Sequence, residues 1–120
     1  MSGLYRKLIV WQKAMQLVEE VHQITKRLPV YEKANLIDQI SRSSISIPSN
    51  IAEGQYRFSK NQNKQFLRIA YGSCAELDTQ LTIVKRLGYV EEHEIDTCEK
   101  LLDEIMRMLN SMLKHTSRSL

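Results

Sequence analysis

The sequence predicts an all-α protein, an up-down-up-down antiparallel bundle of four helices. Four segments carry apolar or small residues in alternating steps of three and four, which is the spacing of one helix face. The connections between these segments are short, so consecutive helices become antiparallel neighbours. Only four Gly and two Pro occur in 120 residues, which argues against a sandwich or a disordered chain. We expect a single domain over residues 1–120, with helices at about 9–28, 32–54, 59–87 and 91–115.

The first two predicted helices are separated by a proline turn. Pro29 ends the first helix because proline disfavours helical geometry in the residue before it. Gly54 is the expected stop of the second helix. The core positions expected in the first helix are Trp11, Ala14, Val18, Val21, Thr25 and Leu28. Those expected in the second helix are Leu36, Ile37, Ile40, Ser44, Ile47 and Ile51.

The last two predicted helices have clear start and stop signals. Ser59 is a suitable N-cap for the third helix, and Gly88 is positioned to end it. Glu91, Glu92 and Glu94 begin the fourth helix, where acidic side chains complement the helix dipole. The core positions expected in the third helix are Leu67, Ala70, Cys74, Leu77, Leu81 and Val84. Those expected in the fourth are Ile95, Cys98, Leu102, Ile105, Leu109 and Met112.

Residues 46–54 break the pattern of the second helix. Pro48 inside a helix removes one amide donor and clashes with the carbonyl of Ser44, at a cost of about 3 kcal/mol. The hydroxyls of Ser43, Ser44 and Ser46 are near enough to satisfy the freed carbonyls, so we expect a kinked but continuous helix. The alternative is a true break, with a new helix that begins near Pro48.

Three segments together indicate a family. SIPSNIAEG stands at 46–54, VWQKA at 10–14, and FLRIAYGS at 66–73 followed by Glu76 and Leu77. In this order they resemble the four-helix bundle proteins encoded by intervening sequences in 23S ribosomal RNA genes, and the resemblance runs from about Leu8 to about Leu113. It implies the same bundle fold and a toroidal homopentamer. Some similar bundles are accessory factors to reverse transcriptases in diversity-generating retroelements.

The polar residues of these segments are expected to have structural roles. Antiparallel pairing through the turn near Arg57 places residues 72–73 opposite residues 42–43, where Gly72 and the serines let the two helices approach closely. The same register brings Arg42 level with Glu76. We therefore predict an Arg42–Glu76 ion pair, partly shielded from water. The alternative is a polar ligand site. The residues of this motif are Arg42, Pro48, Asn50, Glu53, Gly54, Gly72, Ser73 and Glu76.

Nothing in the sequence indicates catalysis. A di-iron bundle needs two Glu-x-x-His elements that point inward, and this chain has one, at Glu19 and His22. Cys74 and Cys98 fall on core stripes at different levels, which favours two reduced thiols. No apolar run reaches the roughly 20 residues that span a bilayer. We expect a cytoplasmic protein that is not an enzyme and has no cofactor or metal.

Charge is distributed unevenly along the expected bundle. Seven of the fourteen acids lie in 91–104, at one end, and ten cations gather at the other end, opposed there by Glu53 alone. Such a cation-rich end attracts phosphate backbones, and Tyr56 and Phe58 in the turn are able to stack on unpaired bases. The alternative is an ordinary solvated face. The predicted nucleic-acid contacts are Lys13, Arg57, Lys60, Lys64, Arg68, Arg107 and Lys114.

Some apolar residues have no place in the core of a four-helix bundle. Ile69, Tyr71 and Ile83 lie off the core stripe of the third helix, and an additional apolar face indicates a partner. We expect a homo-oligomer, a pentamer by the family resemblance. The function that follows is a non-catalytic, oligomeric bundle that binds RNA or another nucleic acid through its basic end. The rival function is a protein adaptor that docks a polymerase or reverse transcriptase.

Overall fold

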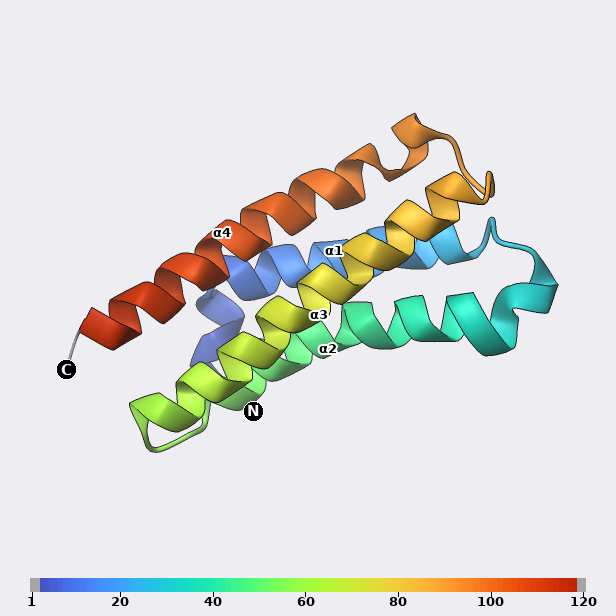
Figure 1. Ribbon diagram of the computed structural model, residues 1–120. Helices are drawn as coiled ribbons and strands as arrows, with labels where there is room; N and C mark the ends of the chain where they lie inside the picture. Colours follow the sequence, from blue (N-terminus) through green and yellow to red (C-terminus); the bar gives the residue numbers. More distant parts are fainter. Residues whose placement is uncertain (1–2, 119–120) are drawn as a thin grey trace.

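The computed structural model describes residues 3–118, and their side chains as far as residue 115. Four helices pack into a bundle: α1 (Ile9–Thr25), α2 (Asp38–Gln55), α3 (Lys60–Arg86) and α4 (Asp96–Arg118). Both α1 and α3 contact α2 and α4, and successive helices run in opposite directions (Figure 1). The molecule measures 47 × 27 × 21 Å. The predicted up-down-up-down four-helix bundle is therefore confirmed.

The core stripe is as predicted for α3, where all six expected positions are buried, and nearly so for α4, where Met112 is half-buried. In α1 the prediction is partly wrong. Trp11 and Val18 are half-buried, and the core takes their neighbours Val10 and Leu17 instead. Val10 and Leu17 directly precede Trp11 and Val18, so the apolar pattern fits a core stripe shifted by one residue equally well. Packing against α2 and α4 selects the shifted stripe.

Short irregular segments join the helices. A 3₁₀ turn (Leu4–Lys7) precedes α1, and a second one (Val30–Glu32) followed by a π-helical turn (Lys33–Ile37) leads into α2. A third (Glu92–Ile95) precedes α4 and forms a capping box between Glu91 and Glu94. Gly88, at φ 77°, ends α3 as predicted, because the amides of Gly88 and Tyr89 bond back to the last turn.

The helix α2 continues through Pro48, so the continuous helix is confirmed and the alternative break is wrong. The expected role of the serines needs correction: the Ser44 hydroxyl donates to the carbonyl of Ser41, one turn earlier. The Asn50 side-chain amide donates to the carbonyl oxygen and the Oγ of Ser46, at 2.8 and 3.0 Å. A side-chain donor therefore reinforces the turn that contains the proline.

The small residues at the α2–α3 contact divide into two kinds. Ser73 meets α2 about one turn from the predicted Ser43, with its Oγ 2.8 Å from that of Ser46. Gly54 is buried, and a Cβ there would lie 3.1 Å from Asn63 Nδ2 and 3.2 Å from Phe66 Cβ. It is thus a close-packing residue within α2, and although α2 ends one residue later, at Gln55, Gly54 lacks the positive φ of a glycine stop. Gly72 has open space around it, so its predicted role in this close approach is also wrong.

Two glycine substitutions separate these roles. Gly54→Ala should lower the free energy of unfolding by about 1–3 kcal/mol, because the added methyl overpacks the contact with α3. Gly72→Ala should raise it by about 0.5–1 kcal/mol, because an exposed helical glycine costs backbone entropy and nothing blocks the methyl. Chemical denaturation of both variants measures these changes. Equal effects at the two positions would contradict the packing described for Gly54.

Candidate nucleic-acid interface

One end of the bundle gathers the α2–α3 turn, the start of the chain and the C-terminal half of α4 (Figure 1). The α1–α2 and α3–α4 connections lie at the opposite end. This is the division expected from the sequence. The predicted basic end and the acidic start of α4 are therefore at different ends of the molecule.

The α2–α3 turn forms the tip of this end. Ser59 caps α3 by accepting a hydrogen bond from the amide of Gln62 at 3.1 Å, and Asn63 donates to the carbonyl of Gly54 at 2.8 Å. Phe58, held between these two anchors, is fully exposed, at 103% of its reference area. Beside it is a hollow of about 360 Å³, which the turn and His115 of α4 line together. The hollow is lined by Gly54, Gln55, Arg57, Phe58, Ser59, Lys60, Asn63 and His115.

The seven predicted contact residues do not form one free basic surface. Arg57 pairs with Glu53 and stacks over the ring of Phe66, whose centroid is 4.6 Å from the guanidinium carbon. Lys64 is about nine-tenths buried, so its stem belongs to the packing of α3. Lys60 lines the hollow at the tip, and Arg68 and Lys114 are exposed.

The other two predicted contacts are paired with acids of α4. Lys13 Nζ lies 2.7 Å from Glu104, and Arg107 lies 3.1 Å from Asp103. The prediction that Glu53 alone opposes the cations of this end is therefore wrong. The reason is that the acidic stretch of α4 reaches far enough along the helix to meet α1 at the level of Lys13.

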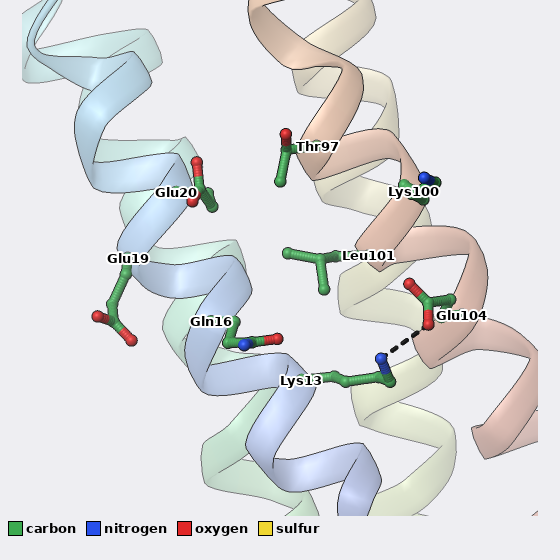
Figure 2. Close-up of a pocket in the computed structure, with 8 residues that line it drawn as sticks. All are labelled: Lys13, Gln16, Glu19, Glu20, Thr97, Lys100, Leu101 and Glu104. Carbon is green, nitrogen blue, oxygen red and sulfur yellow. Dashed lines mark ion pairs between the residues drawn. The ribbon is translucent and has the colours of Figure 1, made fainter.

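The Lys13–Glu104 pair closes a groove of about 470 Å³ between α1 and α4 (Figure 2). Lys13, Gln16, Glu19 and Glu20 line it from α1, and Thr97, Lys100, Leu101 and Glu104 from α4. The charges of its two ammonium groups and three carboxylates nearly cancel. This groove therefore lacks the positive potential that a phosphate backbone requires.

The predicted Arg42–Glu76 pair is wrong. Arg42 Nε pairs with Asp38, at 3.2 Å along its own helix, and the Arg42 side chain is 80% exposed. A partner one turn away is reached with less loss of side-chain freedom than one across the helix contact. Glu53 pairs with Arg57 of the adjoining α2–α3 turn, while Asn50 reinforces the Pro48 turn. Arg42, Glu53 and Asn50 therefore bond to neighbours in α2 or its following turn and not to α3.

Two apolar surfaces lie outside the core. Ile69 and Ile83 are 49% and 41% exposed, as predicted, whereas Tyr71 packs against the core, contrary to expectation. The second surface, which we call the α1–α2 hollow, has a volume of about 350 Å³. It is lined by Tyr5, Trp11, Met15, Val18, Ile45, Pro48, Ser49 and Ala52, none of which is charged.

Both cysteines of the chain lie in the core. Cys74 and Cys98 are free and buried, as predicted, and burial raises the pKa of each thiol to about 12, with nearby Glu20 and Glu99 adding to the shift at Cys98. Both therefore stay protonated at neutral pH. Among the described residues, no three His, Cys, Asp or Glu side chains gather as metal ligands would. None of the helices, as far as they are described, is long and apolar enough to cross a membrane.

Fold and surface define a four-helix bundle with an exposed aromatic residue at a cation-bearing tip and apolar patches outside its core. The chain belongs to the 23S rRNA-intervening sequence protein family, which it matches over residues 6–111. A solved structure from Bacteroides thetaiotaomicron, of a protein with unknown function from the S23 ribosomal protein family, is similar at a TM-score of 0.81 and 26% identity. The similarity covers 88% of this chain and 99% of that one. No curated protein matches the chain significantly.

Proposed function

We propose that this protein is a non-catalytic, cytoplasmic binding protein that holds unpaired RNA at the α2–α3 tip. The observation that carries the proposal is the complete exposure of Phe58 next to the hollow lined by Lys60 and His115. An exposed ring contributes nothing to the core but offers a platform on which an unpaired base can stack. The family name, which refers to an intervening sequence in 23S rRNA, supports RNA as the ligand.

The cations at the tip supply the second part of the binding. Lys60 lies at the hollow, and the exposed Arg68 and Lys114 flank it on α3 and α4. Contacts of this kind depend on the charge of the RNA backbone more than on base sequence, so binding should weaken steeply as the salt concentration rises. Duplex RNA presents no free base to Phe58, so single strands should bind more tightly.

Phe58→Ala should weaken the binding of a single-stranded RNA about 10- to 100-fold, because stacking on an aromatic ring contributes about 1–3 kcal/mol per base. Phe58→Trp should retain the affinity. Titration of a fluorescent RNA by anisotropy measures both, and thermal melting checks that the fold is unchanged, as expected for a fully exposed side chain. If Phe58→Ala binds as well as wild type, base stacking at the tip is excluded.

Glu53→Gln should strengthen RNA binding several-fold at low salt, because it releases Arg57 from its carboxylate partner and removes a negative charge from the tip. Asp78→Asn is the matched control, since it removes one exposed acid from α3 away from the tip. The same titration at several salt concentrations compares them. Equal affinity gains in both variants would mean that only net charge matters.

We also propose that the chain associates with itself, as a pentamer by the family resemblance, through the α1–α2 hollow. Exposed Met15 and Ile45 border this hollow, and stable self-contacts are commonly apolar. The α3 face predicted from the sequence is less suitable. Tyr71 is not part of it, and Glu76 lies midway between Ile69 and Ile83, where it would place a carboxylate in the contact.

Substituting both Met15 and Ile45 with Glu should reduce the mass to that of one chain while helicity stays, because charges would be buried at the self-contact. The matched control replaces Ile69 and Ile83 with Glu and should keep the assembly. Light scattering at micromolar concentration gives the masses. A single-chain mass for the wild type would refute self-association.

A further inference from the structure

Gln80 is the one side chain of the described structure with a fully buried polar atom and no hydrogen-bond partner for it. The residue is 6% exposed, and its Oε1 accepts no hydrogen bond. A buried amide oxygen without a donor costs free energy, and most such groups in proteins are satisfied. The position therefore has a missing partner.

Gln80 borders the surface between α2 and α3. It lines two hollows, of about 430 and 260 Å³, which share Gln39, Glu76 and Gln80 and so form one groove. Gly72 and Ile83 line the first hollow, and Arg42 lines the second. We call this surface the Gln80 groove.

Three donors that line the Gln80 groove bond to other residues of the chain and not to Gln80 or Glu76. Arg42 pairs with Asp38, the Gln39 amide donates to Asn35 at 2.8 Å, and the Ser46 hydroxyl lies 2.8 Å from that of Ser73. The Glu76 carboxylate, one helical turn from Gln80, has no ion pair in the described structure. The groove thus presents two acceptors, one charged and one buried, that none of these bonds satisfies.

The shape of the groove fits a helix. Ile69, Gly72, Glu76 and Ile83 follow one another on α3 in steps of three, four and seven, which keeps them on one face over about 21 Å. Both isoleucines are largely exposed, and the space above Gly72 is open. A second helix can approach most closely at a glycine, with apolar contacts on either side of it.

We propose that the Gln80 groove is the docking site for an amphipathic helix of another protein, whose central Arg or Lys pairs with Glu76 and donates to Gln80 Oε1 once the Gln80 side chain turns toward the groove. A small residue of that helix faces Gly72, and apolar residues cover Ile69 and Ile83. Charge complementarity selects this occupant over a second copy of the chain, because the self-contact proposed above uses the uncharged α1–α2 hollow, which would bring no cation to Glu76. The proposal is independent of RNA binding at the tip.

The probe is a synthetic helical peptide of about 15 residues, or four turns. It carries Leu opposite Ile69 and Ile83, Ala opposite Gly72 and a central Arg, and a second peptide has Leu in place of that Arg. Calorimetry gives the affinities, and the side-chain amide resonance of Gln80 in ¹⁵N spectra reports contact directly. The Arg peptide should bind and shift this resonance, and the Leu peptide should bind at least about tenfold more weakly.

Three variants test the contacts of the groove. Gln80→Leu and Glu76→Gln should each weaken the Arg peptide about tenfold, and Gly72→Leu should block it sterically in a folded protein, because nothing lies near its Cβ. Gln80→Leu should also raise the melting temperature, because it removes the unsatisfied oxygen. A raised melting temperature would show that this variant loses binding without losing its fold. Gln65→Leu, exposed on the same helix, is the control and should bind normally.

Each remaining outcome overturns the proposal. Equal affinity for the two peptides, or no binding of the Arg peptide, means that Gln80 and Glu76 recognise no donor. If Gly72→Leu or Gln80→Leu lowers the mass of the assembly measured without peptide, a second copy of the chain fills the groove.

Discussion

The contact between α2 and α3 is the constraint on which the rest of the structure depends. Helix α2 contains a proline that removes one of its own hydrogen bonds, so neighbouring groups must hold it. Ser46 bonds to Ser73 across the contact, Asn63 of α3 donates to the carbonyl of Gly54, and the lack of a side chain at Gly54 lets the two helices approach. These interactions stabilise α2 on both sides of Pro48.

The proposed RNA-binding tip and the Gln80 groove both lie on this pair of helices. At one end, the tight contact at Gly54 fixes the turn and leaves Phe58 exposed beside Lys60. Along the side, the same two helices form the groove that contains Gln80 and Glu76. A rigid pair of helices can present an aromatic tip and a polar groove at the same time, so RNA and a protein helix would not compete.

The sequence predicted the fold because long helices repeat their pattern many times, as α3 does from Leu67 to Val84. It failed where two residues were equally suitable, as with Val10 and Trp11, and where a nearer partner existed, as Asp38 did for Arg42. The pairing of Lys13 with Glu104 depends on the register of α1 and α4, which no local pattern gives. Gln80 did leave a signal, since it is three residues after Leu77 and four before Val84, both in the core.

Hydrogen exchange of the α2 amides tests most directly whether the contact with α3 holds α2 across Pro48. The account predicts that amides on both sides of the proline, such as those of Ile47 and Ile51, exchange only through global unfolding, with the same free energy as Leu77 in α3. If the amides after Pro48 exchange through a separate, lower-energy opening, the second half of α2 is held independently. The α2–α3 contact would then not be the constraint described here.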